Sequence, residues 1–377
     1  MSGADTDGAR AFLDRAADRM VDATAIERIA IGFASTALAL ALGSVIVAAT
    51  GYDAVEFVTS LVDGAVGSES NIAFTLRQSS MLILAGVAVA IAFRAGVFNI
   101  GVQGQFVVGG FATSLTILYF APHLPEGTTG GVLLMALGAI AAMLAGGAYA
   151  ALPGLMKAYA DANEVITTIM LNFIASGVVY FLIDEYLRPA GTSAPNTERF
   201  PEYVELPRVV FDSPSFSVVG LGVALAAVVL VAVFMSRTRL GYDLVTSGHQ
   251  QSAAAYSGVD PGRTVVTTMV LSGMVAGLAG AVFAVMILGY YSDPSTFPTF
   301  GFDAIAVSLL AANSPVGVVP AGLLFGGLDA GGQYIGFTTD VPSELVDGVV
   351  GLIVLFVAAP ELFRMAGKRA WLGGDRE

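Results

Sequence analysis

The side chains that most often carry chemistry are scarce in this chain. It has no cysteine and only two histidines, His123 and His249, so thiolate nucleophiles, disulfides and Cys/His zinc sites have no residues to be built from. Neither histidine lies near a nucleophile-elbow sequence. The two lysines, Lys157 and Lys368, do not complete the glycine-rich P-loop that cradles a nucleotide. The sequence therefore predicts no catalytic residue, no metal site and no cofactor on this chain, and any ATP must bind a partner protein.

Polar residues gather instead in one short stretch between apolar segments. Residues 93–105 read Phe-Arg-Ala-Gly-Val-Phe-Asn-Ile-Gly-Val-Gln-Gly-Gln. Polar side chains among apolar spans are costly and are functional candidates, and irregular backbone is tolerated there only where protein or a water-filled cavity satisfies its amide groups. The stretch favours a broken helix that lines a permeation route. The alternative is an ordinary short turn with Arg94 at a membrane surface.

A second interruption, Asn-Ser-Pro-Val-Gly at residues 313–317, lies in the other half of the chain. Paired interruptions in two halves are the usual sequence signature of a transport pathway. Asp303 and Asp329 flank or lie within the same apolar segments, where a proton-coupled carrier would use carboxylates as a relay. We favour a helix cap for Asp303 and a hydrogen-bonded interior position for Asp329.

Residues 238–259 form the other informative segment. Gly248 and Gly258 bracket about two helical turns of small residues, Gln250 to Tyr256. A short helix with an alanine-rich face can be gripped by the groove of a partner protein. The alternative interpretation is a plain solvated connector.

Composition indicates the kind of protein that carries these segments. Of the 377 residues 55% are hydrophobic, and only 12% are charged, where a soluble domain has about 25%. With a mean hydropathy of +0.77, the sequence predicts an integral membrane protein. The formal net charge of -13 argues against a nucleic-acid partner, because a phosphate backbone requires clustered lysine and arginine.

The apolar runs predict the architecture. About 20 residues cross the hydrocarbon core as a helix, because each residue rises about 1.5 Å and the core is about 30 Å thick. We predict an all-α, polytopic membrane protein with about ten transmembrane segments, two of the regions being broken helix pairs. The long, charge-free runs are residues 29–49, 131–152, 216–235 and 265–290, and the runs 165–183 and 345–359 are slightly short or interrupted. The broken pairs are 80–93 with 106–120 and 305–312 with 316–330. A count from hydropathy alone could equally return eight segments.

Orientation follows from lysine and arginine, which stay in the cytoplasm when they lie near span ends. With ten segments, both termini are cytoplasmic in a multi-pass protein of the cell membrane. Acidic residues among the N-terminal arginines argue against a cleavable signal peptide. The expected organisation is an amphipathic N-terminal segment at 1–28 (alternatively a disordered acidic tail), a transmembrane domain at 29–360 with an external cap at 184–215 and a long internal loop at 236–264, and a cytoplasmic tail at 361–377.

Four co-linear blocks resemble the permease subunits of ABC importers for purine nucleosides and simple sugars, in the superfamily of ribose-type and branched-chain amino acid-type permeases. They are residues 93–105, residues 163–172 (Asn-Glu-Val-Ile-Thr-Thr-Ile-Met-Leu-Asn), the loop 241–258 and residues 272–280 (Ser-Gly-Met-Val-Ala-Gly-Leu-Ala-Gly). The similarity runs from about residue 80 to residue 360. One departure is Gln103, where that family often has Glu, so a charged role at this position is not carried over.

The resemblance implies a permease that forms half of a translocation pathway for nucleosides, or for sugars such as ribose or glucose. Its partners would be a second related permease, separate ABC ATPase subunits that hold ATP and Mg, and an extracellular substrate-binding lipoprotein that the external cap helps to meet. The expected pathway residues are Phe98, Asn99, Gln103, Gln105, Asn172 and Asn313. The resemblance makes residues 29–360 the permease domain and the internal loop 236–264 its coupling loop. The expected ATPase-coupling residues are Gly241, Gly248, Gln250, Gln251, Ala253, Ala254 and Gly258.

Two other classes of protein compete with this interpretation. A stand-alone ion-coupled secondary transporter or channel would use Asp303 and Asp329 for protons or ions, and it would keep transporting without ATP. A purely structural membrane scaffold would account for neither polar interruption.

Overall fold

The computed structural model of the protein describes residues 25–211, 216–352 and 355. The described part is helical and contains no β-strand, only an isolated antiparallel bridge between Asn196 and Ser292. The chain divides into two compact units, Met1–Gly64 with Gly331–Glu377, and Ala65–Ala330.

The first unit is built from helices that approach one another closely at glycines. Helix α3 begins after Asp53, whose carboxylate accepts hydrogen bonds from the N–H groups of Val55 (2.7 Å) and Glu56 (3.1 Å). The Gly64 backbone of α3 lies against the side chain of Tyr334, so a larger residue at position 64 would overlap it. The helices that contribute to this unit are α2 (Ala25–Ala49), α3 (Ala54–Val66) and the last turns of α13 (Val318–Thr338).

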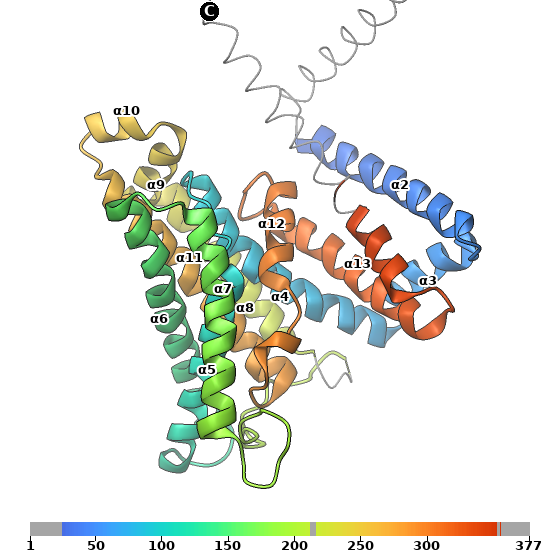
Figure 1. Ribbon diagram of the computed structural model, residues 1–377, viewed down its shortest axis with the longest axis horizontal. Coiled ribbons are helices and arrows are strands. Elements are labelled where there is room, and N and C mark those ends of the chain that lie inside the picture. Colours follow the sequence, from blue (N-terminus) through green and yellow to red (C-terminus); the bar gives the residue numbers. More distant parts are fainter. Residues whose placement is uncertain (1–24, 212–215, 353–354, 356–377) are drawn as a thin grey trace, which may run out of the picture. The chain divides into compact units, whose positions relative to one another are not determined.

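Among the described residues, the second unit contains six helices that are long and apolar enough to cross a membrane. Figure 1 shows α9 and α10 at one end of this unit and the irregular segment that follows α7 at the opposite end. The six helices are α4 (Glu69–Arg94), α5 (Val102–Phe120), α6 (Thr128–Ala160), α7 (Glu164–Leu182), α8 (Val218–Arg237) and α11 (Pro261–Phe283). The shorter elements are η1 (Ala121–His123), η2 (Ile183–Leu187), α9 (Arg239–His249), α10 (Gln251–Tyr256), η3 (Ala284–Leu288), η4 (Pro294–Thr296) and α12 (Phe300–Leu310).

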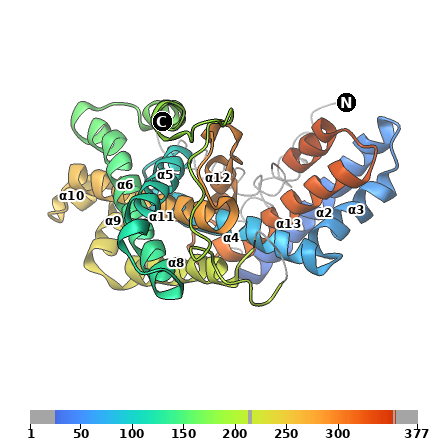
Figure 2. The ribbon, with the colours of Figure 1, turned by 90° about the horizontal axis from the view of Figure 1, so that it is seen from below.

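Helix α11 lies among α4, α5, α6 and α8 (Figure 2). Its glycines allow this close packing: the Gly277 backbone lies against the Ala142 carbonyl of α6, and the Gly280 backbone lies against the Phe106 carbonyl of α5. A Cβ at either glycine would overlap those backbone atoms. Small residues let membrane helices approach in this way, so the glycine spacing in α11 serves packing.

Several helices begin after an N-cap residue whose side chain accepts a hydrogen bond from a free N–H group of the first turn. Ser68, Asn163, Ser217, Thr238 and Asp260 each accept such a hydrogen bond at the start of α4, α7, α8, α9 and α11. Helices α5 and α12 differ, because their N-cap residues, Gly101 and Thr299, provide no side-chain cap. Their first turns must be satisfied by other parts of the protein.

Both predicted interruptions are tight turns between helices. After α4, the N–H of Val97 donates to the Ala92 carbonyl at 3.0 Å and the N–H of Gly96 donates to the Phe93 carbonyl at 3.1 Å. These two bonds, with Gly96 at a φ of 70°, form a Schellman motif.

The turn after α12 repeats this arrangement. The N–H of Asn313 donates to the Ser308 carbonyl at 2.8 Å, and the N–H of Ala312 donates to the Leu309 carbonyl at 2.9 Å. Ala312 takes the place that Gly96 has in the first turn, with a φ of 50°. The two helix ends therefore close in the same way with different residues.

The described helices confirm the all-α prediction and most of its boundaries, but not the count of ten spans. Beside the six long candidates, the described residues hold two shorter apolar helical stretches, Ala37–Ala49 and Phe300–Leu310. The broken pair 80–93 with 106–120 is resolved as a full-length α4 and an α5 that starts four residues earlier than predicted. The N-terminal segment up to residue 24 and the C-terminal tail lie outside the described residues. Of the predicted span 345–359, residues 345–352 and 355 are described and are helical.

Candidate functional site

Four of the predicted pathway residues, Asn99, Gln103, Gln105 and Asn172, lie around the turn from α4 to α5 and are called the amide cluster below. All four are at least nine-tenths buried. Asn99 and Gln105 exchange two hydrogen bonds: Asn99 Nδ2 donates to Gln105 Oε1 at 2.9 Å, and Gln105 Nε2 donates to Asn99 Oδ1 at 3.0 Å. This pair holds the end of the turn against the first turn of α5.

Asn99 also connects the turn to α11. Its Nδ2 donates to Ser272 Oγ at 2.8 Å, and the Ser272 hydroxyl in turn donates to the Ala88 carbonyl of α4 at 2.7 Å. Asn99 Oδ1 accepts a further bond from the Gly101 N–H at 3.0 Å. The side chain of Asn99 thus uses both donors and both acceptor positions within the protein.

The other two amides complete the helix starts that lack caps of their own. Asn172 of α7 accepts from the Gly104 N–H of α5 at 2.7 Å and donates to the Ile100 carbonyl at 2.9 Å. Gln103 of α5 accepts from the Gly301 N–H of α12 at 2.8 Å and donates to the Pro298 carbonyl at 3.1 Å. An amide is suited to both positions because each position needs one donor and one acceptor.

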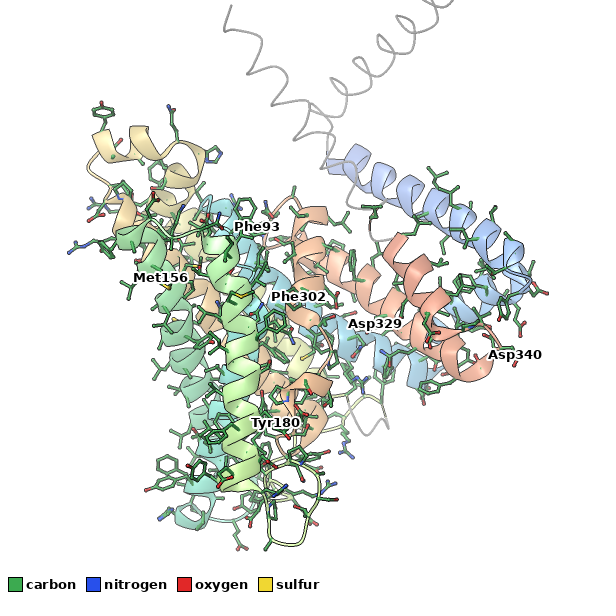
Figure 3. All side chains as sticks on the ribbon, in the orientation of Figure 1. Phe93, Met156, Tyr180, Phe302, Asp329 and Asp340 are labelled. Atoms are coloured by element: carbon green, nitrogen blue, oxygen red, sulfur yellow. The ribbon has the colours of Figure 1, made fainter. Side chains whose placement is uncertain are left out.

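Phe98 is the predicted pathway residue that faces outward from this turn. Its side chain is 46% exposed, and its ring meets that of Phe93 edge to face at a centroid distance of 5.1 Å. Phe93 lies at the end of α4 (Figure 3). The surface beside the amide cluster is therefore aromatic, while the amides themselves point into the protein.

Asn313 does not join the amide cluster. Its Oδ1 accepts a hydrogen bond from Ser308 Oγ at 3.0 Å within the turn that follows α12. Of the two carboxylates near this region, Asp329 accepts a hydrogen bond from Gln78 of α4, as the interior hydrogen-bonded interpretation expects. Asp303 lies in the first turn of α12 and accepts from the Thr299 hydroxyl, so it does not cap a backbone N–H as the sequence suggested.

The predicted coupling loop consists of two short helices, α9 and α10. Gly241 packs against the backbone of Phe234 and Met235 at the end of α8, and Gly248 packs against the backbone at residues 94–96. Gly258, at a φ of 87°, follows α10 and has no atom within 4 Å of the position that a Cβ would take.

Gln250 lies between α9 and α10, and its N–H donates to the Thr246 carbonyl. Ala254 is fully buried, whereas the side chains of Gln251 and Ala253 lie outside the described residues.

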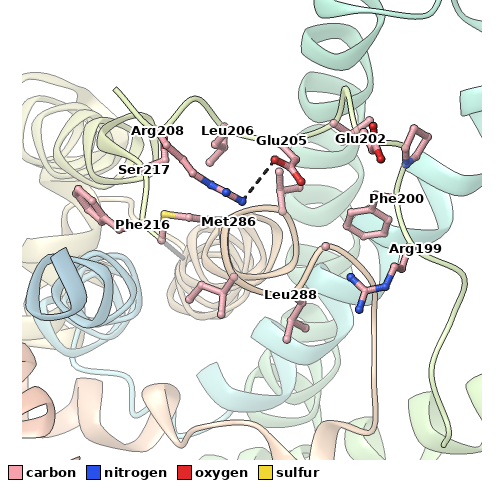
Figure 4. Close-up of a pocket in the computed structure, with 15 residues that line it drawn as sticks. Arg199, Phe200, Glu202, Glu205, Leu206, Arg208, Phe216, Ser217, Met286 and Leu288 are labelled. Atoms are coloured by element: carbon pink, nitrogen blue, oxygen red, sulfur yellow. Dashed lines mark hydrogen bonds and ion pairs between the residues drawn. The ribbon is translucent and has the colours of Figure 1, made fainter. Parts of the chain in front are cut away.

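Residues of the predicted external cap, with Phe216 and Ser217, line a partly open cavity of about 380 Å³ against η3 and Gly289 (Figure 4). Arg199 and Arg208 lie at this cavity with Glu202 and Glu205, and Arg208 pairs with Glu205 at 3.4 Å. Its other lining residues are mostly apolar. The cavity is large enough for a small ligand or a side chain of a partner.

Tyr291 fixes the cap to the rest of the unit. Its N–H donates to Thr197 Oγ1 at 2.9 Å, its carbonyl accepts from the Thr197 N–H at 2.8 Å, and its hydroxyl donates to the Val107 carbonyl at 2.6 Å. Burial raises the pKa of this hydroxyl well above its usual range, so the group stays protonated and keeps donating.

Sequence reasoning missed the groups to which the amide cluster bonds outside itself. Ser272 is a side chain and could have been found, because it is a polar residue inside the apolar run that forms α11. The other partners are backbone groups that no residue type marks: the N–H groups of Gly101, Gly104 and Gly301 and the carbonyls of Ile100 and Pro298. Among the described residues, no group of three or more His, Asp or Glu side chains could hold a metal ion.

The chain matches known proteins over most of its length. Residues 71–358 match the family model described as the permease component of the branched-chain amino acid transport system. The chain is 35% identical to the guanosine ABC transporter permease protein NupP of Bacillus subtilis, over 87% of this chain and 92% of NupP. It is 31% identical to the nucleoside ABC transporter permease protein NupB of Lactococcus lactis, over 84% of this chain and 87% of NupB. It is 32% identical to the glucose ABC transporter permease protein TsgB13 of Haloferax volcanii, over 86% of this chain and 86% of TsgB13.

Proposed function

This chain belongs to the family of branched-chain amino acid transport system permease components, and we propose that it forms half of the translocation pathway of an ABC importer that carries nucleosides. Family membership makes it a multi-pass membrane transport protein and not an enzyme. The single observation that carries the proposal is the 35% identity to a guanosine permease along nearly the whole length of both chains.

The surface beside the amide cluster supports a substrate with a flat face. Phe98 offers a half-exposed ring, and a purine can stack on such a ring with an energy of about 0.5–1.5 kcal/mol. The buried amides Asn99, Gln103, Gln105 and Asn172 then act by holding this turn in place, and Asn313 holds the corresponding turn after α12. Sugars are the second substrate class, because the Haloferax volcanii relative is named as a glucose permease.

ATP hydrolysis is assigned to separate ABC ATPase subunits, which hold ATP and Mg. Supporting this, the sequence contains no P-loop. We place their docking site on α9 and α10, with Gly241, Gly248, Gln250, Gln251, Ala253, Ala254 and Gly258 as contact or positioning residues. These helices lie at one end of the second unit, which fits a cytoplasmic loop when the chain is oriented by its lysines and arginines.

The remaining partners follow from the same assignment. A second, related permease would complete the pathway, and an extracellular substrate-binding lipoprotein would dock on the cap at residues 184–215. The cap lies at the end of the second unit opposite α9 and α10, as this arrangement requires (Figure 1). Both termini would then be cytoplasmic in the cell membrane.

Uptake of labelled guanosine, adenosine, uridine, ribose and glucose by cells with and without this chain tests the proposal. We expect nucleoside uptake to need the chain, to stop when ATP is depleted and to survive collapse of the ion gradient. Uptake that follows the ion gradient would refute the ABC mechanism. Loss of ribose or glucose uptake alone would refute nucleosides as the substrate.

A matched pair of variants tests the role of the aromatic ring. Phe98→Leu removes the stacking surface, and we expect it to raise the apparent KM for guanosine about 2- to 12-fold. Tyr119→Leu is the control, because Tyr119 is 68% exposed at the far end of α5. An equal effect of the two substitutions would contradict the placement of Phe98 in the pathway.

A further inference from the structure

At Gly248, helix α9 meets the turn between α4 and α5 backbone to backbone. A Cβ at Gly248 would overlap the Arg94 carbonyl and the backbone of residues 95–96, and a Cβ at Gly96 would lie 3.0 Å from the Gly248 Cα. No side chain therefore separates α9 from the turn at this point. A contact between two backbones has no rotatable side chain to absorb a displacement, so movement of α9 acts directly on the turn.

The other side of α9 is held against the end of α8. Gly241 packs on the backbone of Phe234 and Met235, and Thr238 Oγ1 accepts from the Gly241 N–H at 3.0 Å. Leu244 and Ser247, on the buried face of α9, are at least nine-tenths buried. Helix α9 is thus a short rigid element placed between α8 and the turn.

The far end of the turn is anchored independently. Asn99 is bonded to Ser272 of α11 and to Gln105 of α5, as described above. Between Gly96, which touches α9, and Asn99, which is held, lie only Val97 and Phe98. Val97 is buried against Met269 and its neighbours, whereas Phe98 faces outward. A displacement applied at Gly96 must therefore be taken up mainly by the backbone at residues 97–98.

One polar group in α9 points to a second arrangement of this contact. Ser247 Oγ, next to Gly248, is buried and has no hydrogen-bond partner among the described residues. Buried hydroxyl groups are normally bonded, so an unpaired one in a rigid element needs an explanation. A shift of α9 that brings a partner within reach of Ser247 would supply one.

We propose that Gly248 is a positioning residue whose backbone contact with residues 94–96 transmits movement of α9 to Phe98, so that the orientation of this ring follows the state of the ATPase subunits. The inference rests on the proposed docking of those subunits on α9 and α10. It assigns the signal a specific entry point, the Schellman turn at the end of α4.

The first test replaces Gly248. In Gly248→Ala the added Cβ forces α9 away from the turn, and we expect ATP-driven guanosine uptake to fall at least fivefold while the ATPase subunits still co-purify with the permease. Gly222→Ala in α8 is the matched control, because no atom lies within 4 Å of its Cβ position, and we expect it to transport normally. Normal uptake by Gly248→Ala would overturn the inference.

The second test needs no change at Gly248 and so decides the matter if Gly248→Ala fails to fold. The chain has no cysteine, so Phe98→Cys gives a single site for a spin label, attached before the ATPase subunits are added. We expect the mobility of this label to change between the nucleotide-free complex and the complex trapped with ATP and vanadate. A label at Tyr119→Cys, at the far end of α5, should stay unchanged.

An identical spectrum of the label at position 98 in both nucleotide states would overturn the inference. The wild-type uptake experiment separates this failure from that of the proposed function. If wild-type uptake depends on ATP while the label does not respond, only the route through Gly248 is wrong. If wild-type uptake does not depend on ATP, the proposed function is wrong as well.

Discussion

Asn172 is the residue whose replacement tests the structural account most directly. Its amide is 4% exposed and satisfies two backbone groups of the α5 start, the N–H of Gly104 and the carbonyl of Ile100. In Asn172→Leu both groups lose their partner inside a membrane domain, where water does not replace it. Each unpaired buried group costs about 1–3 kcal/mol.

The gain from the larger apolar side chain offsets about 1–2 kcal/mol of this loss, at about 0.8 kcal/mol per buried methylene. The two unpaired groups together cost about 2–6 kcal/mol, so at the centre of these ranges the free energy of unfolding should fall by about 2.5 kcal/mol. At about 2 °C per kcal/mol for a chain of more than 150 residues, the thermal transition should fall by about 5 °C.

The assay is the loss of monodisperse protein in detergent after heating, followed by size-exclusion chromatography. Thr167→Val on the same helix is the control. The hydroxyl of Thr167 bonds only to carbonyls of the preceding turn, at Asn163 and Glu164, so its removal leaves no distant group unpaired. We expect a shift below about 2 °C for this control. If Asn172→Leu melts no lower than Thr167→Val, cross-helix capping does not stabilise α5 and the reasoning is refuted.

The other predictions use the same preparation. Gln103→Met should lower the transition by about 4–8 °C, because two backbone groups at the start of α12 lose their partner; an unchanged transition would contradict this. Ala312→Gly should raise the transition by about 1–3 °C. Relief of the φ of 50°, which costs an L-residue about 1–2 kcal/mol, outweighs the stability lost because glycine gains more freedom on unfolding; a lower transition would show that the turn is not strained. Gly277→Leu should abolish the monodisperse peak because its side chain overlaps the backbone of α6, whereas Gly177→Leu, with open space around it, should not. Gly258→Val should leave the folded permease intact but reduce co-purification of the ATPase, since the turn after α10 has a φ of 87°, and full co-purification would place the contact elsewhere.

The two helix breaks could be predicted because their signals are local. Glycine and amide residues interrupt the apolar pattern at residues 94–105 and 313–317, and the helices end within or next to those stretches. Helix α3 was missed because it is only 13 residues long and carries two carboxylates, which hides it from a search for apolar spans. The π-helical turns that end α7 and α11 leave no mark in the residue pattern either.

The hydrogen-bonded pairs within the site could not be predicted, although the sequence singled out all four residues of the amide cluster as candidates. Asn99 and Ser272 are 173 positions apart, and Gln103 bonds to a backbone group 198 positions away. Spacing in the sequence carries no information on such pairs, because they depend on how α4, α5, α11 and α12 pack. The sequence likewise could not show that the amides are at least nine-tenths buried within this chain while Phe98 is about half exposed.

The helix starts that are capped from other helices have a consequence for biosynthesis. A ribosome adds about 5–20 residues per second. Asn172 follows Gly104 by 68 residues, so the start of α5 waits about 3–14 s for its partner during translation. Helix α12, by contrast, is made when Gln103 is already in place. Insertion of this protein therefore passes through a period in which α5 cannot be completed, and that period ends with the arrival of α7.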